Sequence, residues 1–383
     1  MLGPKSSINL RESPVFRSLS RAGAITNHRG LMAAGLLAFG IALFASLMLT
    51  APVRALALRV GMVDLPGPRK VHAKPIPLLG GLAMWGAIML AVLFAFDGPA
   101  RAQSLGIVTG ATLVAAVGFL DDKGWLHHQI KLFGAMPIAA GILLASGIHA
   151  QVFETFVAGR AGYALDAVLT VFWVVGITAS FSILDHMDGL CAGVAAMSSI
   201  FFAMIAYLNG QTLVTTLAAA VLGGATGFLR WNFKPAKIFM GDGGAMFLGF
   251  LMATLGLKLR LEHSNSISGW LVPILILGPT IFDTTLVTIS RSRRGLIPFT
   301  TPGKDHTAHR LANLGWGQRG AVLGMYSLGV VTGGVAVLAT YLSPAGALTV
   351  AVVALATTLA GVALLEQAPY EPQKRKSPEA IAA

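Results

Sequence analysis

Long apolar runs, separated by short polar loops, constrain this chain more than any other feature of its sequence. A helix needs about 20 apolar residues to cross the hydrocarbon core of a bilayer. Charged residues make up only 11% of the chain, whereas soluble domains carry about 25%. The sequence therefore predicts an all-α polytopic membrane protein with about 11 transmembrane helices. The expected spans are 31–50, 76–96, 104–120, 130–148, 164–183, 190–208, 211–229, 243–259, 270–290, 320–341 and 345–365.

The apolar runs predict a single transmembrane domain over residues 31–365. Residues 1–30 form a basic N-terminal tail with five cations, and residues 366–383 form a polar C-terminal tail. No small-residue cleavage site follows the first apolar run cleanly, so we expect a transmembrane helix there instead of a signal peptide. The single cysteine, Cys191, excludes an internal disulfide.

The unusual polar clusters all fall in loops on one side of the predicted membrane. This side, counted with Lys131 and the C-terminal tail, holds 19 of the 28 Lys and Arg residues. The positive-inside rule therefore places it in the cytoplasm. The basic N-terminal tail falls on the other side and conflicts with the rule, which leaves the alternative that 31–50 does not span fully. The cluster-bearing loops are 51–75, 121–129, 184–189, 230–242 and 291–319.

The first of these loops is the richest in prolines. Four prolines fix an extended backbone around Arg69, Lys70, His72 and Lys74, which could together bind a phosphate. The alternative is that these cations only anchor the loop in the cytoplasm. The net charge of +12 does not indicate nucleic-acid binding, because the basic residues are divided among membrane loops. Anionic lipids or phosphorylated substrates are the expected partners.

Two acids, Asp121 and Asp122, end the third apolar run. Neighbours on a helix point about 100° apart, so one acid could face a site while the other braces it. Carboxylates are unfavourable at a helix C-terminus because of the helix dipole. The position therefore favours a functional role over simple helix-end polarity.

A second acidic pair, Asp185 and Asp188, lies at the next boundary on the same side. Residues three apart share one face if they are helical. Acids at a membrane boundary without a nearby cation are candidates for function. For Asp188 the alternative is a cap on the following helix.

The loop around Asp242 combines cations, Asn232, Phe239 and a Gly-Asp-Gly-Gly sequence. Such glycines let the backbone come close to a ligand. Mg²⁺ prefers oxygen ligands and often joins one or two carboxylates to substrate phosphates. Asp242 is therefore the candidate metal ligand, while Lys234 and Lys237 suit either phosphate contacts or membrane anchoring.

The last loop contains His306 and His309, followed by Arg310. A histidine pair raises the possibility of zinc, but a third ligand is not evident in the sequence. The surrounding Lys and Arg residues make anion binding the better interpretation. Asp283, inside the ninth expected span, is expected to pair with a neighbouring polar group.

Five motifs in this order resemble the polyprenyl-phosphate N-acetylhexosamine-1-phosphate transferases of glycosyl transferase family 4, in the N-acetylglucosamine-1-phosphate transferase-like branch. The motifs are Pro-Ile-Pro-Leu-Leu-Gly-Gly (75–81), Gly-Phe-Leu-Asp-Asp (118–122), Leu-Asp-His-Met-Asp-Gly-Leu (184–190), Trp-Asn-Phe-Lys-Pro-Ala-Lys-Ile-Phe-Met-Gly-Asp-Gly-Gly (231–244) and Asp-His-Thr-Ala-His-Arg-Leu (305–311). The resemblance runs from about Asp64 to Gly320.

The resemblance implies a reaction. Such enzymes transfer a sugar 1-phosphate from a UDP-sugar to polyprenyl (undecaprenyl or decaprenyl) phosphate, release UMP and initiate cell-envelope glycan synthesis. They use Mg²⁺, with Mn²⁺ as an alternative, in a bacterial inner membrane. We expect N-acetylglucosamine 1-phosphate or a related N-acetylhexosamine, direct attack of the lipid phosphate with a covalent aspartyl route as the fallback, no nucleic acid, and a homodimer as a further candidate assembly.

The resemblance also implies roles for individual residues. Asp242 and Asp122 would hold the metal. Catalytic roles fall to Asp121, Asp122, Asp185, His306 and His309. Substrate-binding roles fall to Asp188, Asn232 and Phe239, with Phe239 at the uracil-stacking position. The basic loops add Lys70, His72, Lys74 and Arg310 as further substrate-binding candidates.

Two departures from the family pattern are visible. Ser182 stands where the family usually has Asn, and His186 stands where it often has Gly or Asn. The last motif lacks three consecutive histidines, which favours the N-acetylglucosamine branch over a phospho-N-acetylmuramoyl-pentapeptide transferase-like enzyme. A transporter of an acidic or phosphorylated solute is the alternative from another class, but it should carry polar residues near the membrane midplane.

Overall fold

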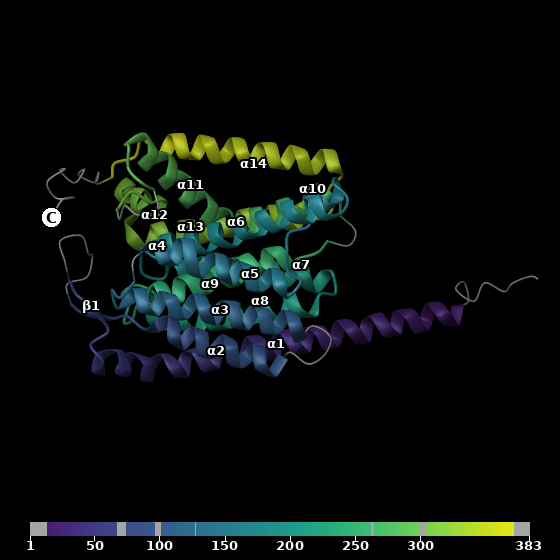
Figure 1. The fold of residues 1–383 in the computed structure, drawn as a ribbon, viewed down its shortest axis with the longest axis horizontal. Coiled ribbons are helices and arrows are strands. Elements are labelled where there is room, and N and C mark those ends of the chain that lie inside the picture. The colour runs from purple at the N-terminus through teal and green to yellow at the C-terminus, as the bar shows by residue number, and fades with distance from the viewer. Residues whose placement is uncertain are drawn as a thin grey trace, which may run out of the picture.

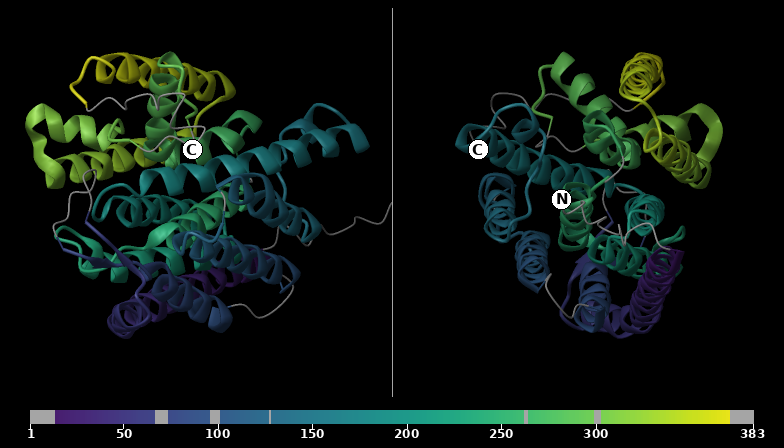
Figure 2. Two further views of the ribbon diagram at one scale, coloured as in Figure 1. Left: turned by 60° about the vertical axis from the view of Figure 1, so that its left-hand side comes forward. Right: turned by 90° about the vertical axis from the view of Figure 1, so that its right-hand side faces the viewer.

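A computed structural model describes residues 14–66, 74–95, 101–126, 128–261, 264–298 and 303–370, with side chains except at 14–27, 95 and 128. The chain folds into a bundle of helices whose axes run broadly along one direction (Figures 1 and 2). The described part of the chain contains a single two-stranded ribbon besides the helices. The predicted all-α membrane class is confirmed.

Seven described helices are long and apolar enough to cross a membrane. They are His28–Arg59 within α1 (Pro14–Arg59), α3 (Arg101–Asp122), α6 (Arg160–Leu184), α7 (Leu190–Leu208), α8 (Thr212–Asn232), the Thr307–Ala339 segment and α14 (Pro344–Leu365). The Thr307–Ala339 segment consists of α12 (Thr307–Leu311), the π-helical turn η4 (Ala312–Trp316) and α13 (Gly317–Ala339).

An eighth span is formed if α10 (Ser266–Ile276) and α11 (Gly278–Arg293), which meet at an angle of 74°, count together. Shorter apolar helices are α2 (Gly80–Ala95) and the pair η2 (Lys131–Ala135) and α5 (Met136–Ala145), which follows α4 (His128–Ile130). The predicted count of 11 is therefore not confirmed. Each expected apolar run nevertheless overlaps at least one described helix, although 130–148 and 270–290 are each divided among several elements.

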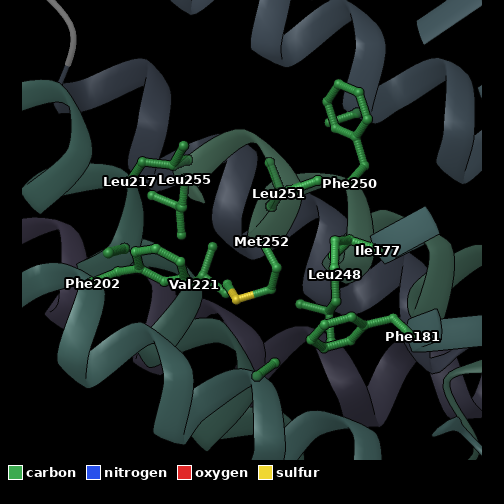
Figure 3. Packing of buried hydrophobic residues seen from close by; sticks show 14 of the residues in the cluster. Ile177, Phe181, Phe202, Leu217, Val221, Leu248, Phe250, Leu251, Met252 and Leu255 are labelled. Carbon is green, nitrogen blue, oxygen red and sulfur yellow. The ribbon is translucent and has the colours of Figure 1, made fainter. Parts of the chain in front are cut away.

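Helix α9 (Gly241–Lys258) lies at the centre of the bundle. Every residue of α9 except Asp242 and Lys258 has a buried or nearly buried position, because α2, α3, α6, α7 and α8 pack around it. Figure 3 shows Leu248, Phe250, Leu251, Met252 and Leu255 of α9 among side chains from α6, α7 and α8. A helix that is apolar all round suits such a position. Its first turn carries Asp242.

Small residues let α3 approach this first turn closely. A Cβ atom built on Gly118 would lie 2.6 Å from the Cα of Gly243. Helices in lipid associate largely through such close contacts between small residues. The glycines after Asp242 are predicted to admit a ligand, but in the structure Gly243 admits α3: its own added Cβ would clash with the ring of Phe119.

The ribbon ties the first polar loop to the start of α9. Strands β1 (Val63–Asp64) and β2 (Ile76–Pro77) pair antiparallel, with Val63 opposite Pro77. Phe239 N–H then donates to Pro77 O (2.9 Å), and Gly81 N–H donates to Met240 O (2.9 Å). Figure 1 places β1, α4 and α12 at the same end of the bundle.

At the other end, the 3-10 helix η3 (Phe153–Thr155) lies in the loop before α6. The predicted tails are described only in part. α1 begins at Pro14, so its helical backbone includes much of the predicted basic tail. Residues 1–13 and 371–383 lie outside the described residues.

Candidate active site

Asp242 is the residue on which the polar clusters converge. It follows Gly241 in the first turn of α9. Its Oδ1 accepts a hydrogen bond from Ser182 Oγ (2.9 Å), at the C-terminal end of α6. Its Oδ2 accepts from Lys131 Nζ (2.5 Å). Two elements that are distant from α9 in the sequence, α6 and η2, therefore place polar groups on one carboxylate.

Asp122 binds the backbone at the start of α9. Its Oδ1 accepts from Asp242 N–H (2.8 Å) and its Oδ2 from Gly243 N–H (3.1 Å). Gly241 has a φ of 70°, and a Cβ there would clash with the Asp122 carboxylate. Asp122 is therefore at the unfavourable end of α3 but at the favourable, electropositive end of α9. The backbone donors of α9 therefore offset part of the electrostatic cost that the position at the end of α3 implies.

Asp121 has a different partner from its neighbour. Its Oδ2 accepts from Lys131 Nζ at 2.6 Å, so Lys131 bridges Asp121 and Asp242. The expected division of the acidic pair between two directions is observed. Lys131 is absent from the predicted site residues. The only signal for it in the sequence is a lone lysine at the start of an apolar run.

Asp185 and Asp188 lie in the connection between α6 and α7. Helix α6 ends at Leu184, so the two acids are not helical and the condition for a shared helical face is not met. Burial, with the neighbouring charges of Asp242, Asp122 and Asp188, raises the pKa of Asp185 well above its ordinary value. Asp185 thus adds to the concentration of carboxylates around Asp242.

Asp188 holds the loop before α9 instead of capping α7. Its Oδ2 accepts from Ala236 N–H (3.0 Å), and the N-cap of α7 is Gly189 without a side-chain bond. Asn232 connects the same segments, since its Oδ1 accepts from Gly189 N–H and its Nδ2 donates to Ile238 O, each at 3.0 Å. Asn232 is buried. Both side chains shape the site, while their predicted substrate contacts stay predictions.

The remaining predicted substrate-binding residues of loops 51–75 and 230–242 are only partly covered by the described residues. Phe239 is half-buried beside the β ribbon, through its backbone bond to Pro77. Lys74 lies just before β2. Lys70 and His72 lie outside the described residues. The phosphate and uracil roles of this group therefore stay predictions.

His306 is held inside the protein by two charged groups. Its Nδ1 lies 2.9 Å from Asp283 Oδ2, and its Nε2 lies 3.3 Å from Arg291 Nη2. A guanidinium only donates hydrogen bonds, so Nε2 accepts and the proton on Nδ1 is donated to Asp283. Asp283, in α11, thus pairs with a neighbouring polar group as expected. The predicted catalytic role of His306 stays a prediction, because both ring nitrogens already have partners.

A stack of imidazole rings joins loop 291–319 to loop 184–189. The ring of His186 stacks on His306 and His309, with centroid distances of 4.0 and 4.7 Å. Burial, then the two neighbouring histidines, lowers the pKa of His186 well below its ordinary value. Neither ring nitrogen of His186 has a hydrogen-bond partner among the described residues. His309 is partly exposed, whereas His306 is buried.

A buried ionic network fixes the histidine loop. Asp305 accepts from Arg291 Nη2 (2.8 Å) and Arg294 Nη2 (2.5 Å), and these cations hold the pKa of the Asp305 carboxyl well below its usual range against the opposing effect of burial. Arg310 has no exposed surface, and its Nη2 lies 2.8 Å from Glu366 Oε1. The structure thus places Arg310 inside this network, and its predicted substrate contact stays a prediction.

Two groups of side chains could be considered for a metal. Asp242, Asp121, Asp122 and Asp185 offer several carboxylate oxygens, the donors that suit Mg²⁺. The surplus of negative charge there, bridged by an ammonium, fits a cation site. Ligand atoms of His186, Asp283 and His306 also lie within 4.8 Å of one another. In that group, Asp283 and Arg291 already occupy both nitrogens of His306, so the carboxylate group is the better candidate.

Comparisons with known proteins identify the family. The family model described as glycosyl transferase family 4 matches residues 104–260. The chain is 36% identical over 300 residues to "Probable undecaprenyl-phosphate N-acetylglucosaminyl 1-phosphate transferase" of Bacillus subtilis, covering 77% of this chain and 82% of the relative.

Two further relatives bear on the branch. The chain is 30% identical over 355 residues to "Decaprenyl-phosphate N-acetylglucosaminephosphotransferase" of Mycolicibacterium smegmatis, covering 85% of this chain and 86% of the relative. It is 31% identical over 212 residues to "Phospho-N-acetylmuramoyl-pentapeptide-transferase" of Streptococcus thermophilus, covering 50% of this chain and 62% of that protein.

Proposed function

Because the chain belongs to glycosyl transferase family 4, we propose that it transfers N-acetylglucosamine 1-phosphate, or a related N-acetylhexosamine 1-phosphate, from a UDP-sugar to polyprenyl phosphate. One observation carries the proposal. Asp121, Asp122 and Asp242, from two distant motifs, meet at the N-terminus of the central helix α9. The products would be UMP and a polyprenyl diphosphate sugar, the first lipid-linked intermediate of a cell-envelope glycan.

The proposed chemistry is direct phosphoryl-type transfer. An oxygen of the lipid phosphate attacks the β-phosphorus of the UDP-sugar, and the bond from that phosphorus to the bridging oxygen breaks as UMP leaves. The nucleophile is already an anion, so the protein must chiefly position the two phosphates and offset their charge. A Mg²⁺ ion held by Asp242, with Asp122 as its predicted partner, would supply part of that charge; Mn²⁺ would serve similarly.

The proposed acceptor explains why the site stands at the end of a membrane bundle. A polyprenyl chain is apolar and its phosphate is not, so the phosphate must meet the donor where helices end. Asp242 lies at the start of α9, and the acids around it lie at the end of α3 and directly after α6. A transporter would instead be expected to place them near the midplane, in broken helices.

The names of the relatives support the N-acetylglucosamine branch. The two relatives named for N-acetylglucosamine align with 77% and 85% of this chain, whereas the muramoyl-pentapeptide transferase aligns with 50%. The form of the last motif, with His306 and His309 separated by two residues, agrees with this choice.

A sugar panel tests the reaction. Purified protein would be mixed with undecaprenyl phosphate, Mg²⁺ and a series of UDP-sugars, and UMP release and the lipid product would be measured. We expect turnover with UDP-N-acetylglucosamine, loss of at least about 100-fold in Asp242→Asn, and near-normal rates in Glu154→Gln. Glu154 lies in η3, before α6, and is the matched control. No UMP release from any sugar would refute the proposal.

The proposed cytoplasmic location of the site in a bacterial inner membrane needs a separate experiment. Single cysteines introduced at Lys304 and Arg160 should react with a membrane-impermeant thiol reagent from opposite sides. Cys191 is buried, so its background labelling is expected to be small. Labelling of both positions from the same side would contradict the positive-inside assignment.

A further inference from the structure

Lys131 makes the closest charged contacts in the carboxylate cluster. Its Nζ lies 2.6 Å from Asp121 Oδ2 and 2.5 Å from Asp242 Oδ2. The side chain is 16% exposed and comes from η2, the π-helical turn after α4. One ammonium thus joins the C-terminal end of α3 to the N-terminal turn of α9.

The contacts of Lys131 are those that a divalent cation would make. An ammonium is a compact cation that donates to oxygen atoms, and Mg²⁺ or Mn²⁺ takes the same hard carboxylate oxygens as ligands. Asp242 Oδ2 cannot hold both cations in the same place. The two positive charges would also repel each other strongly at such a short separation.

We propose that Lys131 is a built-in counter-cation that a divalent metal displaces when it binds Asp242. In the metal-free protein the ammonium offsets the repulsion between Asp121 and Asp242. When the metal binds, the ammonium leaves Asp242 and becomes a hydrogen-bond donor for a substrate phosphate beside it. This second step rests on the proposed function, whereas the exchange of cations does not.

The surrounding contacts allow the exchange without loss of the site. Ser182 Oγ holds the other oxygen of Asp242, Oδ1, and Asp122 holds the backbone of the same turn. Asp242 therefore keeps its orientation when Lys131 moves. A lysine has a flexible four-carbon stem, so its ammonium can shift by a few ångströms while its backbone stays in place.

A purely structural ion pair predicts a different response. If Lys131 only supported the fold, its replacement would disorder Asp242 and weaken or leave unchanged the binding of a metal. If Lys131 competes for the site, its replacement removes a competitor and a repelling charge together. The affinity for the metal then increases.

The experiment measures metal binding without any substrate. Mn²⁺ would be titrated into full-length protein in lipid nanodiscs, and free Mn²⁺ would be followed by electron paramagnetic resonance. We expect Lys131→Gln to bind Mn²⁺ about tenfold more tightly than the unaltered protein, as expected for removal of one adjacent positive charge. Lys258→Gln is the matched control, because Lys258 lies at the opposite end of α9 and its loss should change little.

One further variant makes the result decisive. The double variant Asp242→Asn/Lys131→Gln should lose the tight Mn²⁺ binding, which would locate the gain at Asp242. Unchanged or weaker binding in Lys131→Gln, in a protein that melts as cooperatively as the unaltered one, would overturn the proposal. Tighter binding that persists in the double variant would overturn it as well.

The second step is tested at saturating Mn²⁺. Dissociation constants for UDP-N-acetylglucosamine and for undecaprenyl phosphate would be measured in Lys131→Gln and in Lys258→Gln. We expect about tenfold weaker binding of one of the two in Lys131→Gln, which identifies the phosphate that Lys131 contacts. Unchanged binding of both would refute the phosphate contact. The Mn²⁺ titration stands or fails independently of the proposed reaction.

Discussion

The carboxylate of Asp122 accepts hydrogen bonds from the backbone N–H groups of Asp242 and Gly243, at 2.8 and 3.1 Å. The last residue of α3 thus caps the first turn of α9. Asp242 lies in this turn and accepts hydrogen bonds from Ser182 and Lys131. The cap therefore helps to fix the orientation of the predicted metal ligand. The capping contact of Asp122 and the candidate metal ligand Asp242 therefore involve the same turn of α9.

The cap can be separated from the charge by substitution of Asp122. Asp122→Ala should destabilise the protein by about 1–2 kcal/mol, because two backbone donors lose their acceptor. Asp122→Asn keeps an acceptor oxygen and should lose less stability, but it removes the negative charge and should lower turnover as strongly as Ala. Thermal unfolding in detergent and UMP release would measure the two effects. If Asp122→Ala were as stable as the unaltered protein, the capping role of Asp122 would be contradicted.

The close approach of α3 to α9 predicts a strong effect of a single methyl group. Gly118→Ala would place its Cβ about 2.6 Å from the Cα of Gly243, so backbones must move apart at a cost of about 1–3 kcal/mol. Gly176→Ala in α6 is the control, since nothing lies within 4 Å of a Cβ there. It should be neutral or slightly stabilising, because alanine favours helix. The melting temperature should therefore fall in Gly118→Ala and stay unchanged or rise slightly in Gly176→Ala.

The two histidines of the last motif should respond differently. His306→Gln leaves Asp283 buried without its imidazole donor and should destabilise the protein by about 1–3 kcal/mol. His309 is partly exposed, and no hydrogen bond to it is described, so His309→Gln should retain stability. If His309 contacts the diphosphate, its loss should appear in kcat or KM. A larger loss of stability from His309→Gln than from His306→Gln would contradict the assignment.

Asp185 should make the stability of the metal-free protein depend on pH. Burial and neighbouring carboxylates raise its pKa in the folded state, so the folded state holds a proton that the unfolded state releases. Stability is then lost as pH rises above the unfolded pKa of about 4. Asp185→Asn should therefore be more stable than the unaltered protein at pH 7, and this advantage should shrink toward pH 5. Melting curves without metal at both pH values would measure it.

Added Mg²⁺ provides the control for this pH effect. A cation near the carboxylates offsets their repulsion, so it should remove much of the advantage of Asp185→Asn at pH 7. An advantage that is independent of both pH and Mg²⁺ would show that the gain comes from packing and not from the charge.

The polar clusters show which site residues can be predicted from the local sequence and which cannot. Asp121, Asp122 and Asp242 are recognisable because acids beside long apolar runs are costly and rarely accidental. Lys131 carries no comparable signal, since a lysine at the start of an apolar run is ordinary. Its partner Asp242 is 111 positions away, and no local pattern links the two. For the same reason, the pairing of His306 with Arg291 and Asp283 is visible only in the fold.

Helix α9 shows the same limit for packing. Its apolar residues predict a membrane span, but they do not distinguish a helix that faces lipid from one enclosed by other helices, because both surroundings are equally apolar. The central position of α9 depends on glycines of α2 and α3, which admit its first turn.

The apolar runs and the order of the polar motifs were sufficient to determine an all-α membrane protein of this family, because both can be recognised in short segments of the sequence. The tertiary structure alone decided that Asp122 caps α9, that Lys131 bridges Asp121 and Asp242, and that α9 is central. These relationships depend on which helix ends meet in space. Contacts between distant segments are selected by packing of the whole bundle, and no single segment contains that information.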